Sequence, residues 1–164
     1  RSVGMDLRLI AEALERVVTK SKWRMQVSRL SQGVTLINDT YNANPDSMAA
    51  ALRTLADFPA TRWAVLDGMR ELGNLATSQH RAIGELTVEL GIDHVICVGE
   101  SARDIAAGAK SGRHTLWLPD FAAACNYIVA KVAPDDVLLL KASRSEGLEQ
   151  LAQMIAEQLG EGRS

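Results

Sequence analysis

The chain has 164 residues, which is a usual length for one domain, and 47% of them are hydrophobic. Eighteen Lys and Arg against twenty Asp and Glu leave a formal net charge of −2, without the positive surplus that binding to nucleic acid or an anionic membrane requires. No apolar run reaches the roughly 18 residues that span a bilayer, and no signal-peptide pattern is present. We therefore expect a cytoplasmic domain with no membrane insertion and no nucleic-acid partner.

The two cysteines do not form a disulfide framework or a metal-ligand pattern. Cys97 lies in an apolar run and Cys125 in a helical pattern. We expect both to be buried free thiols, and we predict no metal ligand in the chain.

Strand-like and helix-like segments alternate along the chain. A helix is predicted over residues 5–18, followed by strands over 25–30 and 34–37 whose short connection, ending in Gly33, predicts an antiparallel hairpin. Further strands are predicted over residues 63–66, 94–98, 114–118 and 137–140. The accompanying helices are predicted over residues 46–57, 78–90, 102–109, 121–132 and 146–159.

This alternation is typical of parallel strands joined by right-handed helical crossovers. We predict an α/β fold, a Rossmann-like three-layer sandwich whose mostly parallel six-stranded sheet has one antiparallel edge strand and helices on both faces. Ligands of such sheets bind beyond the carboxyl ends of the strands. The loops over residues 38–46, 67–78 and 141–146 follow the second, third and last strands, so they are the candidate binding loops.

The first of these loops is rich in polar side chains. Asp39 can accept hydrogen bonds from sugar hydroxyls, Tyr41 offers a stacking face, and Asn42 and Asn44 can both donate and accept. Alternatively, Asn44 caps the following helix and Asp39 satisfies its own loop. The residue types alone leave both interpretations open.

The second loop offers carboxylates and a histidine. Asp67 and Glu71 can hold an ammonium group or a metal-bound water. His80 can act as an acid or base, or it can be an ordinary polar residue of the next helix.

The third loop favours an anion. Lys141 and Arg144 supply positive charge, Ser143 and Ser145 supply hydroxyl groups, and a helix is predicted to begin at residue 146. The alternative is that Ser145 caps this helix and both cations are solvated. The chain contains neither a G-x-x-x-x-G-K-[ST] phosphate loop nor a G-x-G-x-x-G turn after its first strand.

These loops closely resemble the C-terminal domain of the Mur ligases. The main match is the block Asp39-Thr40-Tyr41-Asn42-Ala43-Asn44-Pro45-Asp46-Ser47-Met48, which is similar to the family pattern D-[ST]-Y-N-A-N-P-x-S-M. Further matches are Trp23-Arg24-Met25, Met69-Arg70-Glu71-Leu72-Gly73 and Lys141-Ala142-Ser143-Arg144-Ser145. The departures are Trp23 and Ala142 in place of glycines, Asn38 in place of an aspartate, and Asp67-Gly68 in inverted order. The resemblance covers residues 3–159.

The resemblance implies an ATP-dependent ligase of peptidoglycan precursors that joins D-Ala-D-Ala to UDP-MurNAc-tripeptide through an acyl phosphate. In the family, an N-terminal domain holds the UDP-linked substrate, and a central domain binds ATP and Mg²⁺ through its phosphate loop. Because the chain begins at Arg1 without a methionine, we expect residues 1–164 to be the C-terminal domain alone. Its partner would be the central ATP-binding domain of the same polypeptide, and by itself it would be inactive.

The resemblance also implies roles for particular side chains. The residues expected at ATP are Arg24, Asp39, Tyr41, Asn42 and Asn44. The residues expected at the dipeptide carboxylate are Lys141, Ser143, Arg144 and Ser145. The catalytic candidates, which would orient or deprotonate the dipeptide ammonium, are His80 and Glu71. The alternative is a stand-alone binding or regulatory module of the same fold without ligase activity.

Overall fold

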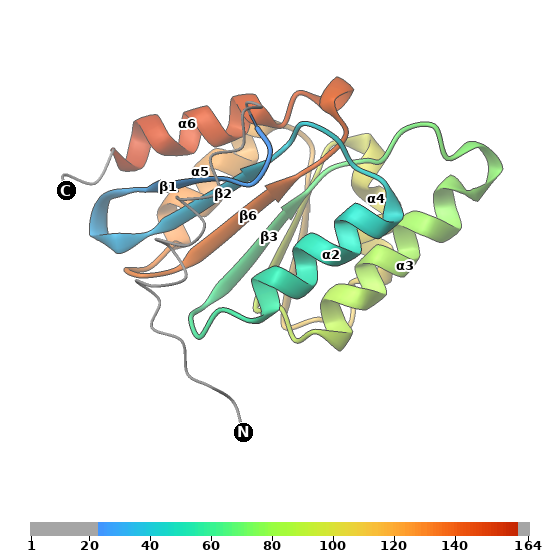
Figure 1. Ribbon diagram of the computed structural model, residues 1–164, viewed down its shortest axis with the longest axis horizontal. Coiled ribbons are helices and arrows are strands. Elements are labelled where there is room, and N and C mark those ends of the chain that lie inside the picture. The colour runs from blue at the N-terminus through green and yellow to red at the C-terminus, as the bar shows by residue number, and fades with distance from the viewer. Residues whose placement is uncertain (1–22, 161–164) are drawn as a thin grey trace.

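The computed structural model describes residues 23–160 (Figure 1). The strands are β1 (Gln26–Arg29), β2 (Thr35–Asp39), β3 (Arg62–Leu66), β4 (His94–Val98), β5 (His114–Leu118) and β6 (Val137–Lys141). The helices are α2 (Pro45–Ala56), α3 (Ala76–Glu89), α4 (Arg103–Gly108), α5 (Phe121–Lys131) and α6 (Glu149–Leu159). The helix predicted over residues 5–18 lies outside the described residues.

The six strands form one sheet in the order β1-β2-β6-β3-β4-β5. β1 runs antiparallel to β2, and every other neighbouring pair is parallel. The central strands β3 and β6 are almost entirely buried, as their continuous apolar sequences require when helices cover both faces. The predicted sheet, with one antiparallel edge strand, is confirmed.

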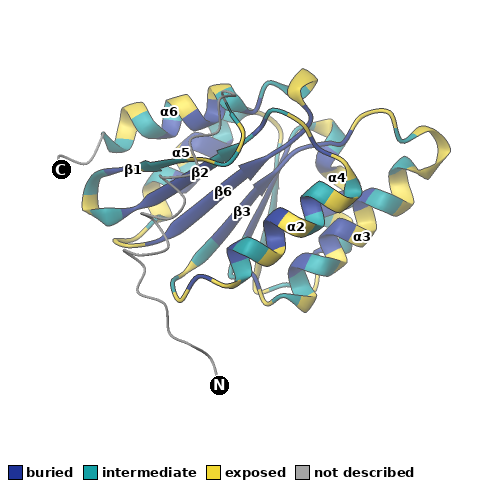
Figure 2. Cartoon of the chain, viewed as in Figure 1, coloured by how far each residue is buried: buried dark blue, intermediate teal, exposed yellow. Residues whose placement is uncertain are grey.

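Helices cover both faces of the sheet and complete the predicted three layers (Figure 1). On one face, α2, α3 and α4 pack with the sheet around a core that includes Met48, Leu52, Ile83 and Ile105. On the other face, α5 and α6 enclose a second core that includes Trp63, Ile128, Leu151 and Ile155. Figure 2 shows the buried strands between these two helical layers.

Both cysteines are buried and free, and they belong to different cores. Cys97 lies in the core under α2, α3 and α4, whereas Cys125 lies in the core under α5 and α6. Burial raises the pKa of the Cys97 thiol to about 12, so this group stays protonated and unreactive at neutral pH.

The connections diverge around β6. β2 and β3 lead into α2 and α3 on one face, while β6, which lies between these two strands, leads into α6 on the other face. Lys141 at the end of β6 is in register with Asp39 of β2 and with Leu66 of β3. The three candidate loops therefore meet at the carboxyl ends of these strands. There the connections turn toward opposite faces of the sheet, an arrangement that leaves room for a ligand.

The start of the last helix was predicted wrongly. The helix begins at Glu149 rather than at residue 146, because Arg144–Glu146 form a separate 3₁₀ turn that ends at Gly147. Gly147 has a φ of 75°, a left-handed conformation that interrupts the helix. Ser145 therefore lies in the 3₁₀ turn and is not a helix cap. Arg144 and Ser145 do not lie at the N-terminus of α6, where the anion site was expected.

None of the helices within residues 23–160 has the combination of length and hydropathy needed to cross a bilayer.

Candidate functional site

A cavity of about 340 Å³ opens at the carboxyl ends of β2 and β6. Its lining residues come from the segment before β1, the loop after β2, the first turn of α2 and the end of β6. They are Arg24, Met25, Asp39, Tyr41, Asn42, Asn44, Ser47 and Lys141. The structure thus brings all five residues expected at ATP into one cavity, together with Lys141.

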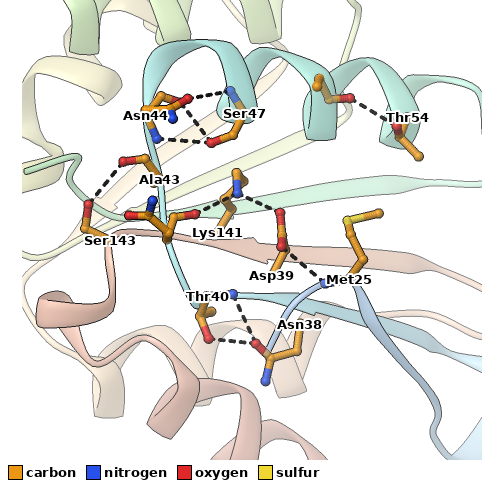
Figure 3. A network of polar contacts seen from close by, with 12 residues as sticks. Met25, Asn38, Asp39, Thr40, Ala43, Asn44, Ser47, Thr54, Lys141 and Ser143 are labelled. Atoms are coloured by element: carbon orange, nitrogen blue, oxygen red, sulfur yellow. Dashed lines mark hydrogen bonds and ion pairs between the residues drawn. The ribbon is translucent and has the colours of Figure 1, made fainter. Parts of the chain in front are cut away.

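A buried ion pair lies in the wall of the cavity (Figure 3). The Lys141 side chain is only 2% exposed, and its Nζ donates to Oδ2 of Asp39 at 2.6 Å and to the carbonyl oxygen of Asn42 at 2.9 Å. The other carboxylate oxygen of Asp39 accepts the Met25 backbone N–H at 3.2 Å. The ammonium group of Lys141, which the sequence pattern assigns to a bound anion, is therefore neutralised within the chain.

Ser143 joins three loops. Its Oγ accepts the backbone N–H of Arg70 at 2.9 Å and lies 3.3 Å from the Ala43 carbonyl oxygen, to which it donates. Its own N–H donates to the Gly68 carbonyl oxygen at 3.0 Å. The hydroxyl group expected at the dipeptide carboxylate is consequently used to hold the loops after β2, β3 and β6 together.

Asn44 caps α2 and also lines the cavity. Its side chain accepts the Ser47 N–H at 2.8 Å, and Ser47 Oγ accepts the Asn44 N–H at 3.0 Å. Pro45 occupies the first helical position, where a missing N–H costs nothing. The capping interpretation of Asn44 is confirmed, and both residues of the capping box line the cavity.

Two guanidinium groups lie against the ring of Tyr41. Cζ of Arg24 is 4.2 Å from the ring centroid, and Cζ of Arg144 is 5.5 Å from it. Arg144 also lies 5.6 Å from the centroid of the Trp23 ring. Within residues 23–160, Arg144 forms no ion pair with a carboxylate, and both Arg144 and its neighbour Ser145 are exposed. These two residues are the members of the third loop that face solvent.

A second polar network lies beyond the carboxyl ends of β3, β4 and β6. Burial raises the pKa of Asp67, which is 3% exposed, to about 7. The Gly68 N–H, which donates to Asp67 Oδ1 at 2.7 Å, lowers this pKa, the charge of Glu146 raises it and that of Arg70 lowers it. Glu146 forms an ion pair with Arg70 and accepts a hydrogen bond from Ser101 at 3.2 Å.

The inverted Asp67-Gly68 order has a steric reason in this chain. A Cβ at position 68 would overlap the side chain of Ser101, so glycine is required there. The carboxylate at position 67 is 3% exposed, and position 68 beside it is buried as well.

His80 and Glu71 do not line the cavity. His80 is buried, its Nε2 accepts the Met69 N–H at 2.8 Å, and it also forms a hydrogen bond with the Ala76 backbone. Burial lowers the pKa of His80, so the ring is neutral at pH 7. Glu71 is exposed, with a left-handed φ of 65°. The structure places Glu71 at the surface of the loop after β3 and His80 inside the protein, in the first turns of α3.

Sequence reasoning missed two residues of the cavity and most of the second network. Ser47 follows Asn44 at the three-residue spacing of a capping box, a signal that predicts its position. Met25, Ser101 and Glu146 carry no such signal, because tertiary packing alone brings them to the strand ends. In the described part of the chain, no three His, Cys, Asp or Glu side chains gather to hold a metal ion.

The fold and this site define a domain of the Mur ligases. A family model described as "Mur ligase, glutamate ligase domain" matches residues 23–144, and the chain belongs to this family as a Mur ligase C-terminal domain. The resemblance predicted from the loop sequences is confirmed.

Curated relatives of this chain share one name within the family. UDP-N-acetylmuramoyl-tripeptide--D-alanyl-D-alanine ligase from Mycobacterium leprae (strain TN) is 39% identical over 93% of this chain and 33% of its own length. The protein of the same name from Escherichia coli (strain K12) is 33% identical over 95% of this chain and 34% of its own length. The chain therefore spans about a third of the length of the curated relatives it matches.

Solved structures agree with this comparison. MurF ligase from Thermotoga maritima, in complex with ADP, superposes with a TM-score of 0.77 at 28% identity, over 87% of this chain and 32% of that one. A MurF structure from Acinetobacter baumannii superposes with a TM-score of 0.78 at 28% identity, over 94% of this chain and 34% of that one.

Proposed function

We propose that this chain is the acceptor-binding domain of a cytoplasmic, ATP-dependent ligase that joins D-Ala-D-Ala to UDP-MurNAc-tripeptide through an acyl phosphate. The observation that carries the proposal is the cavity at the carboxyl ends of β2 and β6, which gathers all five residues expected at the nucleotide. The names of the relatives and the ADP bound to the Thermotoga maritima protein support it.

The cavity suits the sugar and base of ATP better than its phosphates. Asp39 presents a carboxylate for ribose hydroxyls, and Tyr41 offers an aromatic surface beside Arg24, whose charge suits the start of the phosphate chain. The chain has no phosphate loop, so we assign the remaining phosphate contacts and Mg²⁺ to the central domain of the same polypeptide. When bound, ATP supplies the phosphoryl group that activates the tripeptide carboxylate.

We assign the dipeptide carboxylate to Arg144 and Ser145. The Arg144 guanidinium is exposed and carries no carboxylate partner in the described residues, and its planar fork suits bidentate binding of a carboxylate. Lys141 and Ser143 act indirectly, by holding the loops on which these groups stand. Arg144 lies against the Tyr41 ring of the cavity, which would place the acceptor next to the nucleotide.

The amine of the dipeptide requires little chemical help. An α-amino group has a pKa near 8, so a useful fraction is already deprotonated at neutral pH. We propose that exposed Glu71 orients the ammonium form, while His80 holds the loop that carries Glu71 through its hydrogen bond to Met69.

The test of this function uses the complete polypeptide encoded by the gene. We expect ADP release that requires both UDP-MurNAc-tripeptide and D-Ala-D-Ala, and a product that contains the new amide bond. A reading frame that starts near Arg1 and encodes no phosphate loop would instead support the stand-alone binding module. A complete polypeptide that releases no ADP with both substrates would overturn the proposal.

Replacing Arg144 separates the two parts of the site. In the complete ligase, we expect Arg144→Ala to raise the KM for D-Ala-D-Ala by about 10- to 100-fold, the effect of losing one charge-assisted bidentate contact. The KM for ATP should change less than about twofold. Steady-state kinetics with each substrate varied in turn measures both values.

The matched control is Arg113→Ala, which removes an exposed arginine near β5, away from the cavity residues. This variant should leave both KM values unchanged. Equal increases in the two KM values of Arg144→Ala would rule out the assignment of Arg144 to the dipeptide.

A further inference from the structure

Trp23 has a backbone conformation that is unusual for a large side chain. Its φ is 63°, in the left-handed region that favours glycine. The backbone there is fixed to the cavity, because the Tyr41 N–H donates to the Trp23 carbonyl oxygen at 3.0 Å. A glycine would adopt this conformation without strain, so the backbone alone does not explain a tryptophan at this position.

The side chain of Trp23 has a definite neighbour. The Arg144 guanidinium lies 5.6 Å from the Trp23 ring centroid and 5.5 Å from that of Tyr41, so two rings from different segments flank one cation. Both distances are within the range of cation–π attraction. Arg144 is exposed and forms no ion pair within residues 23–160, so these rings are the groups that restrict its position.

Tyr41 by itself is a weak constraint on Arg144. The Arg24 guanidinium lies closer to the same ring, at 4.2 Å, and two like charges that share one ring repel each other. The second ring, that of Trp23, also attracts Arg144, and among residues 23–160 no other cation is recorded over it. Its contribution is to keep the cation at the cavity mouth.

We propose that Trp23 is a positioning residue, whose ring holds the Arg144 guanidinium in place to receive the carboxylate of the incoming dipeptide. This inference rests on the proposed function of Arg144. Trp23 touches no reacting atom. It reduces the freedom that Arg144 loses when the carboxylate binds.

The test compares Trp23→Gly with Trp23→Phe in the complete ligase. Glycine fits the left-handed backbone but removes the ring, so the KM for D-Ala-D-Ala should rise about two- to fivefold, with kcat and the KM for ATP unchanged. Phenylalanine keeps an aromatic ring, so Trp23→Phe should retain most of the wild-type affinity for D-Ala-D-Ala. Trp23→Asn, which also tolerates this φ and has no ring, should behave like Trp23→Gly and serves if the glycine variant does not fold.

The Arg144→Ala background distinguishes the failure of this inference from the failure of the proposed function. With the guanidinium gone, Trp23→Gly should have no further effect on the KM for the dipeptide. If Arg144→Ala itself leaves this KM unchanged, the proposed function of Arg144 is wrong. If Arg144→Ala raises the KM for the dipeptide but Trp23→Gly and Trp23→Asn do not, the positioning role of Trp23 is wrong. It is also wrong if the two Trp23 variants lower the unfolding temperature and raise the KM values for the dipeptide and for ATP together.

Discussion

Lys141→Met should lower the free energy of unfolding of this chain by about 3–5 kcal/mol, the usual effect of removing one partner of a buried ion pair. The methionine fills a similar volume but leaves the Asp39 carboxylate, whose side chain is 15% exposed, without its cation. It also leaves the Asn42 carbonyl oxygen without the donor that Lys141 provides. Urea denaturation of the wild-type and variant chains measures the difference.

Two further variants show whether the pair causes the loss. Arg113→Met disrupts an ion pair with Asp93 in which the arginine side chain is 75% exposed, and it should cost about 0.5 kcal/mol or less. Asp39→Asn combined with Lys141→Met removes both charges and should recover a large part of the loss. A loss of less than about 1 kcal/mol for Lys141→Met would show that the pair does not stabilise this edge of the sheet.

The contribution of Asp67 to the stability of the chain should fall by about 2–4 kcal/mol as the pH rises from about 4 to about 7. Burial raises the pKa of Asp67 from 3.8 to about 7, so within this interval the folded protein holds a proton that the unfolded chain has lost. Each step up in pH therefore favours the unfolded state. Above about pH 7 the contribution levels off, because Asp67 is ionised in both states.

Asp67→Asn isolates this effect. Asparagine retains an oxygen that can accept the Gly68 N–H but does not ionise, so the variant should gain stability relative to the wild type as the pH rises. His80 acts in the opposite direction, because its lowered pKa costs stability below pH 6.5, but it is present in both proteins and cancels in the difference. Denaturation curves at pH 5 and pH 8 that give the same difference between the two proteins would disprove the raised pKa.

The strands and most helix starts were predictable because their signals are local. Val137–Lys141 forms a continuous apolar run ending in a cation, which is typical of a central parallel strand. Asn44 and Asp120 lie just before α2 and α5, and the side chain of each accepts the backbone N–H of the residue three positions further on, as is typical of N-caps. Such signals depend on a few adjacent residues, so packing elsewhere does not alter them.

The start of α6 was not predictable in the same way. Gly147 and the Glu146 ion pair with Arg70, a residue from a different loop, hold the 3₁₀ turn that separates β6 from the helix. A helical pattern that continues through residue 146 carries no information about this contact. The tertiary contact between Glu146 and Arg70 therefore helps to set the start of α6 at Glu149.

The candidate site was predictable as a group of loops, but not as a set of partners. The strand ends indicated that Asp39 and Lys141 lie at the same edge of the sheet. Their pairing follows from the register of β2 and β6, which joins residues 102 positions apart in the sequence. The partner of His80 was not predictable either. Its Nε2 accepts the Met69 N–H because the chain folds back from the loop after β3 into α3. The sequence indicated that Lys141 and His80 were available to a ligand, whereas in the fold each is hydrogen-bonded within the chain.

We propose that this domain supplies one wall of an active site whose other wall belongs to the rest of the polypeptide. Amide formation requires the dipeptide amine within about 3–3.5 Å of the activated carbonyl, and such positioning contributes roughly 7–11 kcal/mol to lowering the barrier. We do not expect the cavity of about 340 Å³ to hold ATP and both substrates in that geometry by itself.

The most direct measurement is amide-bond formation from ATP, UDP-MurNAc-tripeptide and D-Ala-D-Ala, compared between the purified chain of residues 1–164 and the complete polypeptide. We predict turnover by the complete polypeptide and none by the isolated chain. Turnover by the isolated chain would contradict the claim that the active site is shared.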